Sequence, residues 1–592
     1  MLTVYAFDPS RGARFENRLT VRVPYEKLAR GPVGRKIAVI DYDASNRCYY
    51  EGVDLDAAEI LGQNGLPPSE SDPLFHQQMV YAVIMDTLRR FELALGREIT
   101  WKPDTGRRDA PYHGRLKVHP HAMQDANAYY DPARRALCFG YFNASADDAG
   151  VSLPGQVVFT CLSHDIIVHE TTHAILDGIR EYFTDPTGPD AAAFHEGFAD
   201  IVALLQHFSF KDSLLDTIQR TGGLIHRRQL SPDVSAAAGG AMIQAEVGEN
   251  NPMVELARQF GEAMGNRQAL RSALGTPPDP GALARTFEPH DRGGILVAAV
   301  FDAFFSVYIN RTRDLIRMAY PDGRAIVPHF LHADLANRLA EQAARAANRI
   351  QTICVRALDY CPPVDITFGD YLRALVTADR DAMADDAGGY RAALVSAFRA
   401  RGVRPEGVVS YSDEALAWEP YAGTRSSDVN PDFLRLWATI NAFEDEPIAD
   451  NEEQIYERLW GKAESYRAEL GLSPGYRVQP QSLHPLYRVR PDGSLQRQIV
   501  AQLVQKRDGI EVEPGNPDAG TFTFRGGTTL LISRQGEVRF SISKPIDGPA
   551  GEARLERQRE HLRRMGNSFA LAPYVAFDPT RDLRFETIHR GY

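Results

Sequence analysis

The sequence predicts an α+β fold, because stretches with strand-like alternation and stretches with helical periodicity follow one another along its 592 residues. Strand patterns dominate up to about residue 70 and again over residues 100–159. Helical patterns dominate residues 164–403. We therefore expect a β-rich part and then an α-rich part, with an additional α+β region in residues 404–592.

Local sequence patterns predict the individual strands and helices. Residues 1–70 combine short alternating runs with Gly and Pro, which is typical of strands joined by turns. Apolar side chains recur at helical spacing over 75–95, directly after Asp72-Pro73, a pair typical of a helix start. Further helices are expected over 164–180, 333–360, 390–401 and 430–470, and strands within 100–159 and 475–546. These patterns divide the chain into four regions: 1–70, 71–180, 181–403 and 404–592.

Composition excludes several classes of protein. With 44% hydrophobic and 24% charged residues, the chain is neither disordered, nor collagen-like, nor a coiled coil. A formal charge of -12 gives no general attraction to nucleic acid or to an anionic membrane, so neither is an expected partner. The most apolar run, 295–308, is too short to span a bilayer and contains Asp302. Five scattered cysteines and the lack of an apolar signal-like stretch favour a cytoplasmic location, with export by another route left open.

The most informative segment is a helical run with the order His-Glu-x-x-His. His169 and His173 are four residues apart, so they share one face of a helix and can present two imidazoles to one zinc ion. Glu170 lies beside that metal, where a carboxylate can activate a bound water molecule. Two ordinary histidines on an amphipathic helix are the alternative that this spacing leaves open.

A catalytic zinc site with one open position needs a third protein ligand. Residues 192–201 form a second apolar helical run, in which Glu196 and Asp200 lie four apart on one face. Buried carboxylates are costly unless they are paired or bound to a metal. We therefore expect Glu196 to be the third ligand and Asp200 to accept the free ring N–H of His169. His195 is an alternative ligand, and a solvated acidic stripe fits the apolar neighbours poorly.

These residues and four further segments resemble the gluzincins, and within them the thermolysin-like neutral metallopeptidases. Asn127-Ala128-Tyr129-Tyr130 is similar to the edge-strand motif that holds substrate backbone, and Leu270-Arg271-Ser272 to a Leu-Arg-Ser element near the substrate. His290-Asp291-Arg292-Gly293 is similar to the segment with the downstream catalytic histidine, although Gly293 stands where the family usually has Ser. Residues 368–403 resemble the family's final helices. The resemblance covers about residues 70–403 and implies a thermolysin-like two-lobed catalytic unit, a β-rich lobe followed by an α-helical lobe.

The resemblance implies an endopeptidase with one Zn²⁺ that cleaves peptides or proteins on the N-terminal side of bulky hydrophobic residues. Glu170 is then the general base. His290 stabilises the oxyanion, and Tyr182 is the candidate phenol that adds a second donor. Both have structural alternatives: Tyr182 as a packed aromatic at a helix end, and His290 as a loop histidine before a buried helix.

The same resemblance assigns substrate-binding roles. Asn127 and the carbonyl of Ala128 bind an extended peptide as an added strand. Leu270 lines the pocket for the residue after the scissile bond, and Arg271 contacts the substrate carbonyl.

The chain departs from the family pattern where that family binds calcium. Asp165 matches one calcium ligand, but His207 stands where a bridging Glu is expected. Residues 209–221 offer only Asp212 and Asp216 as further acidic groups. We therefore expect the family's double calcium site to be absent or incomplete. The usual secretion signal and inhibitory propeptide are not recognisable either, so narrow specificity, gated access or export by another route must restrain the enzyme.

Two other functions are weighed against this one. Zinc aminopeptidases share the Glu-Gly-Phe-Ala sequence of residues 196–199, but their Gly-x-Met-Glu-Asn motif lies upstream of the metal motif. Here the nearest match, Gly240-Ala241-Met242-Ile243-Gln244, lies downstream and lacks the Glu-Asn pair. The other rival is a retired protease scaffold that binds a peptide or protein partner, with its function in residues 404–592. The chain keeps all four residues expected at the catalytic metal site, which argues against a loss of activity. They are His169, Glu170, His173 and Glu196.

Residues 404–592 show no metal-ligand spacing, and their histidines His484, His561 and His589 are isolated. The region can be an exosite, a module that docks a protein partner or an inhibitory cover. One repeat stands out: residues 6–16 recur as residues 576–586, with eight of eleven aligned positions identical. A Pro-containing turn that leads into a strand explains the repeat, and so does a pair of equivalent docking elements.

Overall fold

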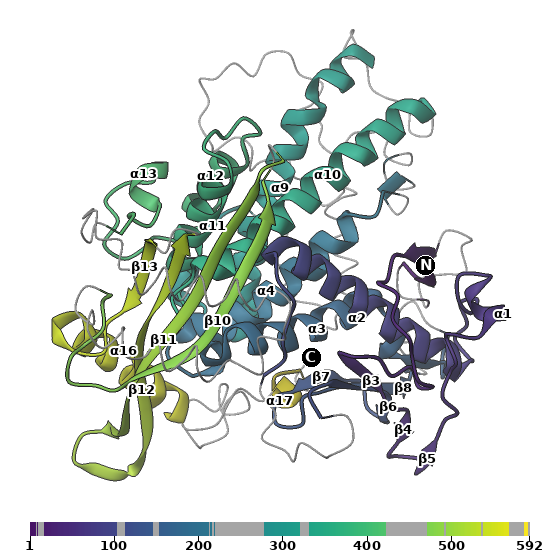
Figure 1. Cartoon of the computed structure of the whole chain (residues 1–592), viewed down its shortest axis with the longest axis horizontal. Coiled ribbons are helices and arrows are strands. Elements are labelled where there is room, and N and C mark those ends of the chain that lie inside the picture. The colour runs from purple at the N-terminus through teal and green to yellow at the C-terminus, as the bar shows by residue number, and fades with distance from the viewer. Residues whose placement is uncertain are drawn as a thin grey trace.

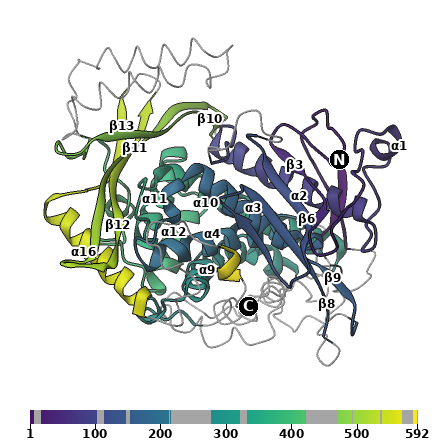
Figure 2. The same ribbon diagram turned by 90° about the horizontal axis from the view of Figure 1, so that it is seen from below.

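The computed structural model describes residues 1–6, 9, 17–102, 113–145, 153–211, 214–215, 218, 277–319, 331–421, 470–490, 493–533, 537–567 and 585–589. Within these residues the fold is mixed α+β, which confirms the predicted class. Most of the helices lie between two sheets (Figures 1 and 2). One sheet comes from the N-terminal part of the chain and the other from the C-terminal part. The helix expected over 430–470 lies outside the described residues.

The first sheet has five strands in the order β3-β6-β8-β7, with β9 also paired to β8. β6 runs parallel to β3 and β8, whereas β7 and β9 run antiparallel to β8. Among the described strands β7 pairs on one side only, so its other edge can accept a ligand. The strands are β3 (Ile37–Val39), β6 (Leu116–Met123), β7 (Ala128–Asp131), β8 (Ala136–Asn143) and β9 (Val157–Phe159), beside the small pairs β1 (Leu2–Tyr5) with β2 (Arg18–Val21) and β4 (Tyr42–Asp43) with β5 (Cys48–Tyr49).

Helix α2 shows how the local sequence sets the bounds of an element. It spans Pro73–Leu95, as its periodicity predicts. Asp72 caps its start by accepting a backbone N–H at 3.0 Å, and Pro73 suits the first turn, where no N–H is needed. Gly96 ends the helix with a φ of 72°, a left-handed conformation that favours glycine.

Three helices build the centre of the molecule. α3 (His164–Ile179) packs against α4 (Pro189–Phe208), and α9 (Pro289–Ala319) packs along α4 on another side. The remaining helices and helical turns are α1 (Ala58–Leu61), η2 (Thr160–Leu162), η3 (Glu181–Thr184), α8 (Ala282–Arg285), α10 (Ala333–Ala357), η6 (Leu358–Tyr360), α11 (Phe368–Ala382), α12 (Tyr390–Ala400) and α13 (Asp413–Leu416). The helices predicted over 164–180, 333–360 and 390–401 are thus confirmed.

A second, antiparallel sheet covers another side of the helices, in the order β10-β11-β12-β13. Its strands are β10 (Val478–Val489), β11 (Leu495–Glu513), β12 (Asn516–Ser533) and β13 (Val538–Lys544), and α16 (Gly548–Asn567) follows. The strands predicted within 475–546 are confirmed. A last short helix, α17 (Phe585–His589), lies away from this sheet and beside β7 (Figure 1).

The second sheet shares its hydrophobic core with the helices. Leu486 and Leu531 belong to the same buried apolar cluster as Phe194 of α4. A buried ion pair between Arg488 of β10 and Asp359 of η6 crosses the same interface. The boundary predicted near residue 403 therefore separates elements that share one core.

Two observations bear on the expected environment of the protein. All five cysteines lie in the described part of the chain and are free thiols. Among the described helices, α9 is long and apolar enough to cross a membrane, but 72% of its most apolar window is buried inside the protein. A core helix passes the same test of length and composition, so α9 is weak support for a membrane span.

Candidate metal centre

Helix α3 presents the two histidines of the His-Glu-x-x-His motif on one buried face. His169, Glu170 and His173 are at most 3% exposed. The Nε2 atoms of His169 and His173 lie 2.9 Å apart. The one-turn spacing read from the sequence therefore places the two ring nitrogens at one point, as a shared metal ion requires.

Helix α4 adds a carboxylate to this point. Glu196 Oε2 lies 3.4 Å from His169 Nε2 and 3.5 Å from His173 Nε2. Ligand atoms bound at about 2.0–2.1 Å around a tetrahedral zinc lie about 3.3 Å apart, close to these separations. Glu196 Oε1 and Glu170 Oε2 are buried and have no hydrogen-bond partner among the described residues. The residues present therefore fit a metal ion, and His169, His173 and Glu196 form a buried cluster that can hold one.

His169 and His173 each have a contact at Nδ1, the ring nitrogen that points away from the metal position. His169 Nδ1–H donates to Asp200 Oδ1 at 2.9 Å, in the arrangement predicted from the sequence. The Nδ1 atoms of His173 and His195 lie 3.4 Å apart. His195, the alternative ligand, thus lies on the far side of His173 from the cluster. These contacts leave both Nε2 atoms facing the metal position.

Helix α9 brings His290 to the same carboxylate. His290 Nε2 lies 3.4 Å from Glu196 Oε2, and its Nδ1 lies 3.2 Å from a carboxylate oxygen of Glu288. A close helix contact makes this possible, because a Cβ atom on Gly197 would lie 2.8 Å from the backbone oxygen of Gly293. Gly197 and Gly293 thus allow the backbones of α4 and α9 to approach closely.

Burial and neighbouring imidazoles set the charges of the two glutamates. Burial raises the pKa of Glu170 above its ordinary value, although His589 and His169 act against this. Burial also raises the pKa of Glu196, but His173, His290 and His589 outweigh it and hold that pKa well below its usual range. Glu196 is thus the anion of the centre, and Glu170 is the carboxylate better suited to take up a proton.

The edge strand predicted to hold substrate lies beside the cluster. Asn127 and Ala128 at the start of β7 are buried, and Asn127 Oδ1 has no hydrogen-bond partner among the described residues. The Ala128 carbonyl accepts a hydrogen bond from His589 Nδ1–H at 2.8 Å. Leu270 and Arg271, the other two substrate-binding predictions, lie outside the described residues.

His589 is the residue of this centre that the sequence did not indicate. Its Nε2 lies 3.5 Å from Glu196 Oε2, and its donor atoms complete a group of four whose ligand atoms all lie within 4.8 Å of one another. The other three members are His169, His173 and Glu196. No ligand spacing surrounds His589 in the sequence; the only signal was the repeat 576–586, which ends three residues before it.

The prediction of a catalytic phenol at Tyr182 is not supported. The Tyr182 hydroxyl donates to Gln481 Oε1 of β10 at 2.9 Å, and the Arg525 guanidinium lies over its ring at 4.5 Å from the centroid. Both partners belong to the second sheet, which the resemblance did not cover. The side chain therefore packs at the helix–sheet interface, and a catalytic role for Tyr182 stays a prediction.

Comparisons with known proteins assign no family. No protein-family model matches this chain, and no curated protein is detectably similar to it in sequence. Function must therefore be inferred from the chemistry of the centre itself.

Asp165 and His207, the two residues compared above with a calcium site, contact each other. His207 Nδ1 lies 3.3 Å from Asp165 Oδ1. Asp212 and Asp216 lie outside the described residues. The expectation about calcium therefore stays a prediction.

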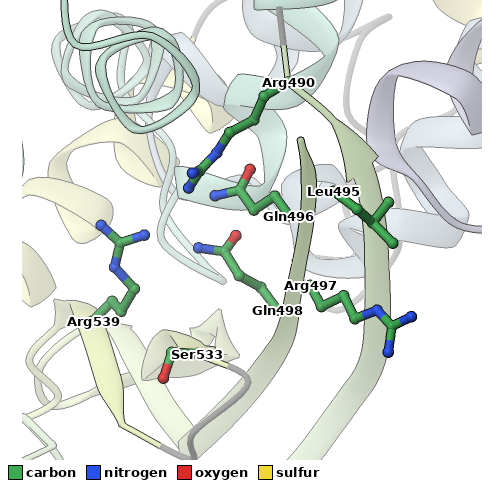
Figure 3. A pocket seen from close by; sticks show the side chains of 7 residues that line it. All are labelled: Arg490, Leu495, Gln496, Arg497, Gln498, Ser533 and Arg539. Atoms are coloured by element: carbon green, nitrogen blue, oxygen red, sulfur yellow. The ribbon is translucent and has the colours of Figure 1, made fainter. Parts of the chain in front are cut away.

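Two other polar features of the described residues lie apart from the metal centre. His76 Nδ1 and His121 Nε2 lie 2.8 Å apart beside Cys161, and Asp41 and the Glu70 carbonyl contact their outer nitrogens. A surface hollow of about 420 Å³ lies at one end of the second sheet (Figure 3). Arg490, Gln496, Gln498 and Arg539 point into it, and the last three bond to Asp381.

Proposed function

We propose that this protein is a zinc-dependent endopeptidase. The observation that carries the proposal is the convergence of His169, His173 and Glu196 on one buried point, with Glu170 on the neighbouring helical position. Two imidazoles and one carboxylate are a donor set typical of catalytic zinc, because they leave coordination positions for water and substrate. The thermolysin-like two-lobed arrangement, with a β-rich and an α-helical lobe meeting at this point, is part of the same proposal.

The chemistry divides between the metal and the protein. A zinc ion supplies Lewis acidity, which polarises the scissile carbonyl and lowers the pKa of a water molecule. Glu170, whose pKa is raised by burial, accepts a proton from the attacking water and passes it to the leaving amine. His290, whose Nε2 lies 3.4 Å from Glu196 Oε2, is the proposed donor that stabilises the oxyanion.

Substrate binding follows from the edge strand. An extended peptide pairs with the free edge of β7, where the Ala128 carbonyl accepts a backbone N–H and the Asn127 amide contacts the next peptide group. This pairing fixes the scissile bond over the cluster. The space between Tyr130, His173 and His195 takes a phenylalanine ring, that of Phe585, which supports a preference for bulky hydrophobic residues.

Metal analysis combined with peptide cleavage tests the proposal. The full-length protein is purified, its metal content is measured by elemental analysis, and cleavage of a peptide library is followed with and without a chelator. We expect about one zinc per chain and cleavage, before bulky hydrophobic residues, that stops with the chelator and returns with zinc. The same assay is run on the full-length His589→Ala variant, because His589 lies at the cluster. Lack of bound zinc, or chelator-insensitive cleavage, would contradict the proposal.

A further inference from the structure

Residues 585–589 occupy the free edge of β7. They form the helical turn α17, which lies beside this strand in Figure 1. The Asn127 amide donates to the Glu586 carbonyl at 3.4 Å, and His589 Nδ1–H donates to the Ala128 carbonyl at 2.8 Å. These are the two residues of the strand that a bound peptide would use. The segment and a peptide substrate therefore compete for the same groups.

The hydrogen bond of His589 also fixes which of its nitrogens can bind a metal. A carbonyl oxygen only accepts, so the proton of the neutral ring lies on Nδ1 and the lone pair lies on Nε2. That Nε2 lies 3.5 Å from Glu196 Oε2. One ring nitrogen of His589 also lies within 4.8 Å of the ligand atoms of His169 and His173. The separation from Glu196 matches those of the other two histidines. His589 is therefore oriented as a fourth ligand, with its outer nitrogen held as those of His169 and His173 are.

Two apolar side chains anchor the segment. Phe585 and Ile588 are fully buried and belong to the main hydrophobic core. The Phe585 ring lies 4.3 Å from the His173 ring and 6.0 Å from the Tyr130 ring, between centroids. The contact with a metal-binding residue places this anchor inside the site.

The conformation of the segment suits an inhibitor better than a substrate. A substrate bound to an edge strand is extended, whereas residues 585–589 are helical. His589 Nδ1 also lies 3.4 Å from Glu170 Oε1, so the ring occupies the space in which Glu170 would meet a water molecule. A zinc site with four protein ligands is closed, and closed sites are structural rather than catalytic.

We propose that His589 is a fourth protein ligand of the metal and that residues 585–589 form an internal inhibitor of the site. The inhibitory part rests on the proposed peptidase function, whereas the ligand part depends only on the metal cluster. Activity then requires displacement of the segment, by substrate, by a partner or by cleavage before residue 585.

The inference gives one copy of the internal repeat a role. Residues 585 and 586, the described end of the copy over 576–586, lie in the site. The other residues of this copy, 576–584, lie outside the described residues, so both interpretations of the repeat stay open. Residues 404–592 then include an inhibitory cover, one of the three roles considered for this region.

Cobalt substitution tests the ligand assignment independently of activity. The full-length protein and the full-length variants His589→Ala and Phe585→Ala are loaded with Co²⁺, whose absorption spectrum depends on ligand number and type. Acetohydroxamate serves as a probe for open coordination positions. His332→Ala is the control, because the His332 side chain is 77% exposed. Circular dichroism verifies that each variant is folded, and His589→Ala, which removes no core side chain, provides the result if Phe585→Ala does not fold.

We expect a changed spectrum in His589→Ala and an affinity for acetohydroxamate that rises by roughly ten-fold or more, because the internal competitor is gone. Peptide cleavage should rise by a similar factor in both variants, whereas His332→Ala should match the unchanged protein. An unaltered spectrum and affinity in His589→Ala overturn the ligand assignment. Cleavage that is measurable but equal before and after the substitution overturns inhibition. A changed spectrum without cleavage by any variant supports His589 as a ligand and counts against the peptidase function.

Discussion

His169 Nδ1 lies 2.9 Å from Asp200 Oδ1, on the opposite side of the ring from the Nε2 atom that faces His173. A carboxylate in this position holds the ring in one orientation and keeps the Nε2 lone pair free for a metal. We predict that Asp200→Asn weakens metal binding by about 10–100-fold, since the amide lacks the charge that makes the imidazole a better ligand. A competition titration against a chromophoric chelator measures this. Asp314→Asn, at a position 74% exposed, is the control, and equal affinities of the two variants would contradict the role of Asp200.

The contact between α4 and α9 depends on glycine. A Cβ atom on Gly197 would lie 2.8 Å from the backbone oxygen of Gly293, and backbone atoms cannot move aside as a flexible side chain can. Gly197→Ala should therefore lower the free energy of unfolding by about 1–3 kcal/mol and move His290 away from Glu196, with loss of activity. Gly188→Ala, at the N-cap of the same helix with nothing within 4 Å, should cost less than about 1 kcal/mol, because only a modest capping preference is lost. Urea unfolding measures the free energy of unfolding of both variants. Comparable decreases would show that the close contact between α4 and α9 is not what makes Gly197 important.

Asp359 joins the second sheet to the helices. It is fully buried, accepts two hydrogen bonds from Arg97 at 2.8 and 2.9 Å, and also pairs with Arg488 of β10. Asp359→Asn leaves both guanidinium groups buried without a counter-charge, so we predict a loss of about 3–5 kcal/mol in unfolding free energy. Asp314→Asn, which removes the exposed pair with Arg317, should cost less than about 1 kcal/mol. Urea unfolding at neutral pH compares the two, and a small effect of Asp359→Asn would mean that the sheet is held by apolar packing alone.

His76 makes stability depend on pH. Burial and, to a smaller extent, the neighbouring His121 lower the pKa of His76 to about 3, whereas the unfolded chain has an ordinary histidine pKa near 6.5. Below the unfolded pKa the unfolded state binds the extra proton, so stability from this residue is complete above pH 6.5 and is lost as pH falls toward 3. At pH 5, His76 lowers the free energy of unfolding by about 2 kcal/mol relative to neutral pH. His76→Gln should reduce the drop in unfolding free energy between pH 7 and pH 5; an unchanged drop would assign acid sensitivity to other groups.

The sequence was sufficient for the parts of the centre that depend on one helical turn. His169 and His173 on α3, and Glu196 and Asp200 on α4, are each four residues apart, so helical periodicity alone places each pair on one face. The helices themselves were predictable because their apolar periodicity is strong. That these two faces meet followed from chemistry, since buried carboxylates and imidazoles satisfy each other around a metal.

Contacts between distant segments were not predictable. His589 lies 393 residues from Glu196 in the sequence, and no spacing rule connects them. Tyr182 was assigned to the site by resemblance, but its hydroxyl bonds to Gln481, 299 residues away, in a sheet that the resemblance did not cover. Both outcomes depend on where residues beyond 403 pack, which local periodicity does not determine.

The most direct test of the proposed peptidase chemistry is the combination of zinc content and peptide cleavage in the Glu170→Gln variant. Both are measured in the full-length protein that also carries His589→Ala, with and without Glu170→Gln, so that the internal segment does not mask activity. We predict about one zinc per chain in both proteins, because Glu170 is not a ligand, and a loss of kcat/KM of about 10²–10⁴-fold on Glu170→Gln, because the general base is gone. Equal kcat/KM with equal zinc content would contradict the role of Glu170 as general base and with it the proposed peptidase mechanism.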